Sequence, residues 1–430
     1  MKLHRYLSIT ALLFLCGTLE AQDTLRMTLD SCLRYAYGHN TTILNTELGR
    51  ESAEATLSGA KMNFLPSVNT SASLGLSWDD KTTRSSNYGI NASLPIFSGL
   101  ANLNTLRQSQ AGVEQSELQV QQARNSVGAR IISAYLTILM NKEKLSYQQE
   151  VLETSRQQKL EGELKYSVGK ILESDYKLLE ASYLSAEAEI DNTRLTIENN
   201  RVALASLLCY DGNAVIEVVP STDSLTAEGR RLETFDSVYA QSLRNLPDVQ
   251  ISELNIDMAR YNVNIARSSF LPTLALNAGT SYNEGSVISD NPVTNINGGL
   301  NTSLTLGLSI PLFNRGATLT SYRKSKIALR EAELNHRQTL VDLREDVEKL
   351  YTETLVALNR FRASEATAEA YHASYDVYAI KFSQGAVTAV EMLQQQERYL
   401  SALNDWLQNK YSYLLAEKQL DIYTGREIKL

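Results

Sequence analysis

The chain has 430 residues, of which 43% are hydrophobic, and a formal net charge of −8 without a block of basic residues. This composition is ample for a folded protein and too polar for a helical membrane protein, and its charge argues against nucleic acid as a partner. Beyond the N-terminus the sequence contains no run of 18 apolar residues, so we expect no transmembrane helix.

Residues 1–21 have the pattern of a signal peptide. Lys2 and Arg5 supply positive charge, an apolar stretch follows, and Ala21 is a small residue that could precede the cleavage site. Lipidation of Cys16 is the alternative, although Leu15 is large for the residue before a lipidated cysteine. Either interpretation predicts that the mature protein leaves the cytoplasm.

Four uncharged segments predict β-strands. Residues 64–78 read FLPSVNTSASLGLSW, in which apolar residues or Thr alternate with small polar residues or Gly, and 87–97, 270–282 and 299–310 continue the pattern. We therefore expect two β-hairpins, 64–98 and 270–313, with loops over 79–86 and 283–296. Uncharged alternation is typical of transmembrane strands. The alternative is a soluble sandwich, whose wet face normally carries charges.

Aromatic residues near the strand ends predict two interfacial girdles. The candidates are Trp78, Tyr88 and Tyr282 beside the loops, and Phe64, Phe97, Phe270 and Phe313 at the opposite end.

The chain is an internal duplication. TLDS at Thr28 matches TFDS at Thr234, and FLPSV at Phe64 matches FLPTL at Phe270, both at an offset of 206 positions. Later motifs match at an offset of 216, which indicates one insertion between the two strands. We predict a first repeat at 22–213 with a helical hairpin at 99–210. An equatorial linker at 214–232 and a second repeat at 233–430 follow, the latter with a helical hairpin at 314–423.

The remaining sequence favours long helices. The chain contains no Pro between Pro95 and Pro220 or after Pro311, and both stretches are rich in good helix formers. Gly169 and Gly385 are the expected breaks. Each repeat should hold a helical run of about 35 residues before its strands, one of about 65 after them, and one of about 35 beyond the glycine.

Four strands cannot close a barrel, and unpaired strand edges in lipid are costly. We therefore expect an α+β membrane protein in which several chains pool their hairpins around a wide aqueous passage, continued by a barrel of long helices.

The repeated motifs resemble those of the TolC family of outer-membrane efflux proteins across essentially the whole mature chain. The motifs are the opening helix, the FLP step into a strand, the P-[IL]-F step out of the second strand, and the [YF]-S-x-G turn. The resemblance implies a homotrimer with four transmembrane β-strands per chain in one shared barrel, and a helical tunnel across the periplasm. It also implies docking to a periplasmic adaptor protein and an inner-membrane transporter of the RND or ABC class.

The resemblance assigns roles to the turns between the long helices. Asp175 and Glu391 lie at the family's position for inward-facing gate carboxylates, although Thr388-x-x-Glu391 also reads as a capping box. Val387 and Gln394 stand where an arginine and a second carboxylate can occur, so a salt-bridged lock is not implied. The expected adaptor-docking tips are Tyr166, Val168, Gly169, Lys170, Phe382, Gln384, Gly385 and Ala386.

No sequence feature predicts an enzyme, a metal site or a cofactor. The four His are scattered without metal-ligand spacing, and no catalytic or phosphate-binding motif follows a suitable strand. Cys32 and Cys209 are either small buried residues or a disulfide. The resemblance favours an exit duct for drug efflux or type I secretion. The alternative is a structural trimeric coiled-coil or adhesin-like surface protein without a channel.

Overall fold

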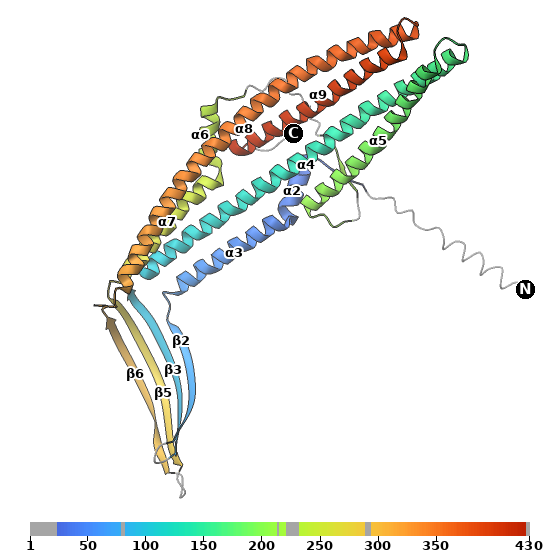
Figure 1. Ribbon diagram of the computed structural model, residues 1–430. Helices are drawn as coiled ribbons and strands as arrows, with labels where there is room; N and C mark the ends of the chain where they lie inside the picture. The colour runs from blue at the N-terminus through green and yellow to red at the C-terminus, as the bar shows by residue number, and fades with distance from the viewer. Residues whose placement is uncertain (1–23, 79–81, 213–214, 221–231, 289–293, 427–430) are drawn as a thin grey trace, which may run out of the picture. The chain divides into compact units, whose positions relative to one another are not determined.

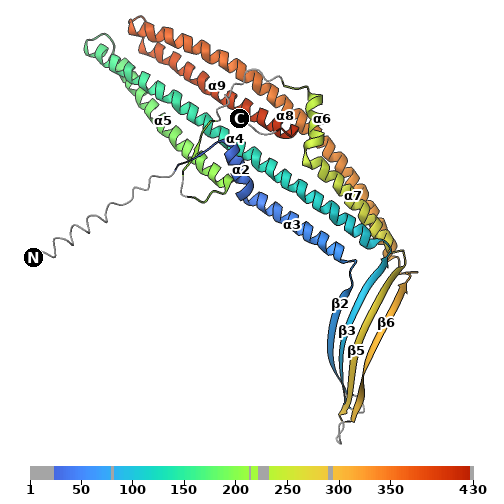
Figure 2. The same cartoon turned by 180° about the vertical axis from the view of Figure 1, so that it is seen from behind.

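The computed structural model describes residues 24–78, 82–212, 215–220, 232–288 and 294–426. The predicted signal peptide, with Cys16, lies outside the described residues. The elements follow one another (Figures 1 and 2) as β1 (Thr24–Met27), α2 (Leu29–His39), α3 (Thr41–Met62), β2 (Ser67–Trp78), β3 (Thr82–Ser98), α4 (Ala101–Ser167), α5 (Glu173–Leu208), β4 (Val215–Val218), α6 (Phe235–Asn245), α7 (Pro247–Ser268), β5 (Thr273–Ile288), β6 (Thr294–Ser309), α8 (Ala317–Ser383) and α9 (Ala389–Thr424).

The two β-hairpins join into one four-stranded antiparallel sheet with the order β2-β3-β5-β6. Figure 1 shows β2 and β6 as its two edges. The pairing between β3 and β5 brings the two sequence repeats together, with one register shift between Pro95 and Phe97. The sheet is open, because β2 and β6 are not paired to each other.

Strands β3, β5 and β6 are longer than the sequence pattern predicts, whereas β2 begins at Ser67, after the Phe-Leu-Pro step. The expected loops 79–86 and 283–296 are wrong at their ends: β3 begins at Thr82, β5 runs to Ile288 and β6 begins at Thr294. The extensions carry Arg84 and Glu284, so the strands are not free of charge. The added residues are mostly polar and break the alternation, while main-chain pairing continues through them.

The long helices have matching lengths in the two repeats. Helices α4 and α8 have 67 residues each, and α5 and α9 have 36 each. The expected runs of about 65 and about 35 residues therefore agree with the structure. Each pair turns at the predicted glycine, Gly169 or Gly385, both of which have positive φ.

Each opening helical run is broken into two helices. Asn40 ends α2, and its side-chain oxygen accepts from the Thr42 amide at 2.9 Å as α3 begins. Its amide nitrogen donates to the Leu207 carbonyl at 2.8 Å, which ties the break to the end of α5. In the second repeat Pro247 opens α7, because the ring fixes φ and suits the first helical turn.

The predicted linker 214–232 contains a strand. β4 pairs in parallel with β1 near the start of the described chain. Lys142 on α4 donates to the Val218 carbonyl at 2.8 Å, and the buried Tyr135 hydroxyl donates to the Val219 carbonyl at 2.5 Å. These contacts fix the end of β4 against α4.

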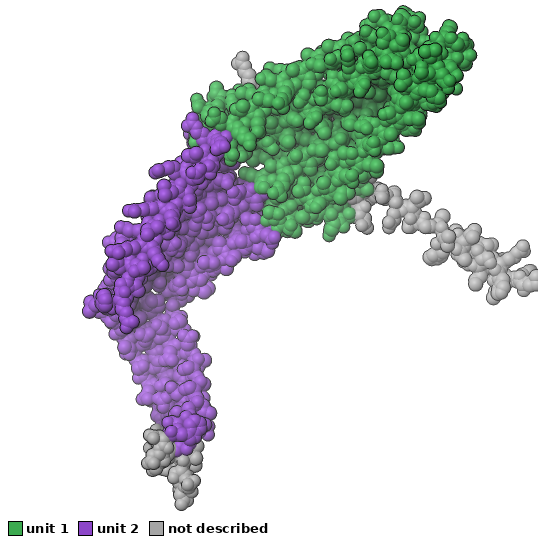
Figure 3. Space-filling model, viewed as in Figure 1, with its two compact units in different colours: residues 1–44, 124–242, 346–430 green, residues 45–123, 243–345 purple. Residues whose placement is uncertain are grey.

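The chain forms two compact units, which do not coincide with the sequence repeats (Figure 3). Unit 1 comprises 1–44, 124–242 and 346–430, and unit 2 comprises 45–123 and 243–345. Unit 2 holds the four-stranded sheet, and unit 1 holds the β1–β4 pair and the helical turns at Gly169 and Gly385. Each unit draws on both repeats. Within the described ranges, every helix is too short or too polar to cross a membrane.

The two described cysteines are free. The Cys32 thiol is buried and lies 3.9 Å from the Met27 sulfur, and burial raises its pKa to about 12. The Cys209 sulfur lies 3.9 Å from the Thr41 hydroxyl. The disulfide interpretation is therefore wrong, and Cys32 acts as a small buried residue.

Candidate functional site

The strand register assigns the two faces of the sheet in unit 2. Directly opposite residues share a face, and one cross-strand row reads Ala72, Tyr88, Tyr282 and Leu300. Leu276 and Leu306 pair on this same face. Leu300 and Leu306 are 71% and 60% exposed, so the sheet presents an uncovered apolar surface.

The opposite face is uncharged and polar. One row across all four strands reads Asn69, Asn91, Gly279 and Ser303. Another reads Ser73, Asn87, Asn283 and Gly299. Small neutral side chains of this kind can line water without packing a core or holding a charged solute.

Two charges interrupt the apolar face near the loops. Arg84 pairs with Leu76 on β2, and Glu284 pairs with Ser86 on β3. Both lie beyond the Tyr88–Tyr282 pair toward the loops. On β3 and β5 the apolar band therefore ends at this tyrosine pair, as expected of an interfacial aromatic row.

The seven candidate interface aromatics fall into two groups. Trp78 is 75% exposed at the loop end of β2, while Tyr88 and Tyr282 lie farther from the loops than predicted because the strands extend past them. At the other end, Phe270 packs edge-to-face against Tyr322 of α8, with ring centroids 6.0 Å apart. The remaining members of that group are also exposed: Phe64, Phe97 and Phe313. That these seven aromatic residues contact lipid stays a prediction.

The turns between the long helices have the same hydrogen bonding in both repeats. The Gly169 amide donates to the Tyr166 carbonyl at 2.9 Å, and the Lys170 amide to the Lys165 carbonyl at 2.8 Å. In the second turn, the Gly385 amide donates to the Phe382 carbonyl at 3.0 Å. The glycine φ values of +73° and +74° suit a left-handed helix end, which a residue with a side chain adopts at a cost.

Most of the predicted docking residues are exposed. Tyr166 and Val168 are 40% and 63% exposed, and the other exposed members are Gly169, Lys170, Gln384, Gly385 and Ala386. Phe382 differs, because it is 3% exposed and packs in a small core with Leu179, Ala389 and Met392. The Phe382 ring is therefore not on the surface of the tip, and the sequence alone did not indicate that this predicted docking residue is buried.

The two gate candidates have different local roles. Glu391 forms a capping box: its amide donates to the Thr388 hydroxyl at 3.3 Å, and the Thr388 amide donates to its carboxylate at 2.8 Å. The hydrogen bonds from Thr388 hold the pKa of Glu391 below its usual value. Asp175 is half-buried in the first turn of α5, whose N-cap residue Leu172 makes no side-chain cap.

Lys165 is the tip residue that sequence reasoning missed. From the last turn of α4 its ammonium group donates to the carbonyls of Phe382 at 2.7 Å and Ser383 at 3.2 Å, at the end of α8. It also lies 2.8 Å from the Glu161 carboxylate and 4.4 Å from the centre of the Phe382 ring. Lys381 holds the equivalent place in the second repeat but lies over the Tyr378 ring of its own helix. Only tertiary packing distinguishes these two lysines.

The fold defined by this sheet and these helical hairpins is that of the TolC-like outer-membrane channels. The solved structure of the Campylobacter jejuni CmeC outer membrane channel superimposes with a TM-score of 0.71 at 20% identity, covering 92% of this chain and 85% of CmeC. The chain is 21% identical to the outer membrane protein TolC of Vibrio cholerae over 385 residues, which are 88% of this chain and 86% of that protein.

The family assignment follows from a second comparison. The sequence model of the outer membrane efflux protein family matches residues 33–209 and 238–426, and the chain belongs to this family. The alkaline protease secretion protein AprF of Pseudomonas aeruginosa is 26% identical over 185 residues. That match spans 43% of this chain and 37% of AprF. Members of the family are outer-membrane channels that extend into the periplasm, and this protein is located there.

Proposed function

We propose that the protein is a homotrimeric exit duct that works with a periplasmic adaptor protein and an inner-membrane pump of the RND or ABC class. The open sheet carries the proposal. One face is apolar and exposed, the other is small, polar and uncharged, and the edge strands β2 and β6 are unpaired in a single chain. Open edges in lipid are costly, so copies of the chain must complete the barrel.

The comparisons support the direction of transport. AprF is named for protease secretion, and a relative from Pseudomonas putida, OpmQ, is named for pyoverdine export. On this proposal the polar face of the sheet lines the exit, and Asp175 and Glu391 contribute carboxylates to a narrow ring at the periplasmic end. The turns at Gly169 and Gly385 bind the adaptor.

Disulfide trapping tests the shared barrel. The starting variant has Cys32 and Cys209 replaced by serine. We then introduce one cysteine on β2 and one on β6, which should form disulfides between neighbouring chains. Moving the two cysteines along β2 and β6 identifies which residues of the two strands lie opposite each other in neighbouring chains. Oxidation of outer-membrane fractions should give covalent trimers at matched positions. Failure to form any species above the monomer, from protein that is correctly inserted, would contradict the shared barrel.

Dye accumulation tests the transport role. Deleting the gene should raise the intracellular level of a fluorescent efflux dye, and restoring the gene should lower it again. A surface adhesin or stalk without a channel predicts equal dye levels in the deleted and restored strains.

A further inference from the structure

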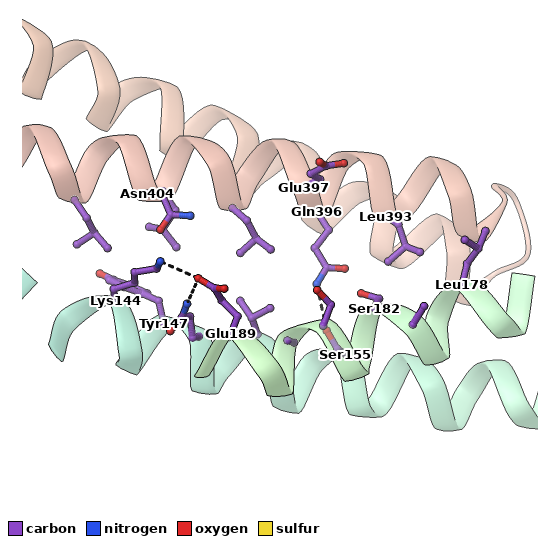
Figure 4. Close-up of a pocket in the computed structure, with 18 residues that line it drawn as sticks. Lys144, Tyr147, Ser155, Leu178, Ser182, Glu189, Leu393, Gln396, Glu397 and Asn404 are labelled. Carbon is purple, nitrogen blue, oxygen red and sulfur yellow. Dashed lines mark hydrogen bonds and ion pairs between the residues drawn. The ribbon is translucent and has the colours of Figure 1, made fainter. Parts of the chain in front are cut away.

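A cavity of about 560 Å³ lies in unit 1 between α9 and the hairpin formed by α4 and α5 (Figure 4). Its volume falls in the range typical of sites for small organic molecules. Aliphatic side chains from all three helices form much of its wall: Val151, Leu178, Leu393, Leu400, Leu403 and Leu407. The cavity therefore offers an apolar space to a molecule that bridges the two hairpins.

A buried amide crosses this apolar space. Gln396 extends from α9 toward Ser155 on α4 (Figure 4), and its amide nitrogen donates to the Ser155 hydroxyl at 3.4 Å. Gln396 is only 5% exposed, and its side-chain oxygen has no hydrogen-bond partner among the described residues. A buried carbonyl oxygen is costly to leave without a donor, so a donor on a bound molecule would be favoured here.

A second acceptor of the same kind, on Gln148, lies about two helical turns along α4 from Ser155. The Gln148 amide nitrogen donates to the Glu189 carboxylate at 3.3 Å, and Lys144 donates to the same oxygen at 3.0 Å. The side-chain oxygen of Gln148 is buried, again without a partner in the described part of the chain. The lining carries two carboxylates, Glu189 and Glu397, and the single ammonium group of Lys144. Lys144 pairs with Glu189, so the exposed Glu397 is the excess charge of the lining, and it favours a cation over an anion.

We propose that the cavity binds small cationic amphiphiles that combine an ammonium N–H donor with an apolar body. The carbonyl oxygen of Gln396 accepts from the ammonium group, and the leucine-rich wall covers the apolar body. A neutral alcohol would satisfy an acceptor without matching the charge. A quaternary ammonium ion would match the charge without supplying a donor. The proposal concerns binding only and does not depend on the transport role.

Tryptophan fluorescence offers a direct measurement. The Trp406 ring packs edge-to-face on Tyr147, a lining residue, with centroids 6.2 Å apart. The chain has two tryptophans, so the Trp78→Phe variant leaves Trp406 as the only reporter. The full chain, purified and held in an amphipathic polymer, is titrated with octylammonium and with octyltrimethylammonium.

We expect saturable binding of octylammonium, and binding of octyltrimethylammonium at least about tenfold weaker, the size of effect expected when a hydrogen bond to a charged group is lost. Both probes carry the same octyl chain, so partition of that chain into the polymer does not account for a difference in affinity between them. Equal affinity for the two probes, or a response to octylammonium that does not saturate, overturns the proposal. This comparison needs no change within the cavity.

Matched variants then locate the site. Gln396→Leu removes the buried acceptor at similar volume and should weaken octylammonium binding about tenfold. Gln394→Leu makes the same change at an exposed position of the same helix and should leave binding unchanged. Should Gln396→Leu fail to assemble, Gln396→Met removes the same acceptor with an unbranched side chain and should weaken binding equally. Unchanged binding in the cavity variants, or equal loss in the control, contradicts the assignment.

Discussion

The ammonium group of Lys165 donates a hydrogen bond to the main-chain carbonyl of Phe382 at 2.7 Å, and so joins α4 to the end of α8. The last carbonyls of a helix lack partners within the helix and lie at the negative end of its dipole. Lys165 gives the Ser383 carbonyl a donor and adds a second donor to the Phe382 carbonyl, which also accepts from the Gly385 amide. Its positive charge also lies at the negative end of the dipole. Because its side chain is only 17% exposed, water competes weakly for these hydrogen bonds.

Replacing Lys165 by methionine should loosen the end of α8. The free energy of local opening should fall by about 1–3 kcal/mol, the usual effect of removing hydrogen bonds from a charged group. Hydrogen–deuterium exchange of the amides around Phe382 measures this opening directly. Lys170→Met is the matched control, because Lys170 is exposed on the neighbouring turn. In this variant, exchange of the amides around Phe382 should stay unchanged. Equal acceleration in both variants would show that Lys165 does not join the hairpins.

An arginine on the apolar face of the sheet should destabilise the protein according to its depth. Leu306 pairs with Leu276, and Leu306→Arg should cost about 2–4 kcal/mol if it lies near the middle of the membrane. Leu74 lies opposite Ser86, in the row of Glu284 beyond the tyrosine pair, and Leu74→Arg should cost about 0–1 kcal/mol. Assembled protein in outer-membrane fractions, titrated with urea, gives both values.

Thr305→Arg controls for the size and charge of arginine. Thr305 pairs with Asn277 on the polar face, so its replacement should be tolerated. A defect there as large as that of Leu306→Arg would mean that the faces are assigned incorrectly.

Bulky residues at the tip glycines should disturb docking while leaving the fold intact. Gly385 has a φ of +74°, and no atom lies within 4 Å of an added Cβ. Gly385→Leu therefore costs only backbone strain, about 1–2 kcal/mol. We expect outer-membrane assembly to persist, and export and crosslinking to the adaptor to be lost. Asparagine tolerates this conformation, so Gly385→Asn should retain both activities better than leucine. Normal export by Gly385→Leu would refute the docking role, and Gly169→Leu gives an independent test in the first turn.

The gate hypothesis predicts a change in ion selectivity. Asp175→Asn combined with Glu391→Gln removes two charges from each chain and keeps side-chain size. Because distant charges are screened within roughly 8–10 Å at physiological salt, a large effect must come from carboxylates at the narrow part of the passage. We expect weaker cation selectivity and weaker block by multivalent cations. An unchanged reversal potential in a salt gradient would rule out the gate role.

The capping role of Glu391 predicts a different response to pH. Its pKa is lowered in the folded protein by hydrogen bonds from Thr388, so the stabilisation is present above the usual glutamate pKa and is lost as pH falls through the lowered value. Glu391→Gln should therefore be less stable than the wild type at neutral pH, and the difference should disappear in acid. Thermal unfolding across this pH range separates the cap from the gate, and the two roles are compatible.

Alternation along the strands was sufficient to predict the faces of the sheet. The period of two places residues such as Leu306 and Thr305 on opposite sides, and between the two register shifts the pairing keeps that assignment across all four strands. The strand ends were missed because the polar residues around Arg84 look like a loop, and main-chain hydrogen bonds do not depend on side-chain polarity. The β1–β4 pair was missed because strands of four residues carry too little pattern.

The tips were predicted in position but not in packing. Positive φ at Gly169 and Gly385 follows from local sequence, since few residues other than glycine end a helix in this way. The burial of Phe382 and the contacts of Lys165 depend on how one hairpin meets the other. Lys165 and Lys381 hold equivalent places in the two repeats, so no local pattern could tell them apart.

The most direct test of the exit-duct account is the conductance of the purified, assembled protein in planar lipid bilayers. The account predicts discrete, long-lived current steps whose size rises with salt concentration, as a water-filled passage lined by uncharged polar residues requires. Correctly assembled protein that inserts into the bilayer and carries no current would contradict the account and favour a structural role.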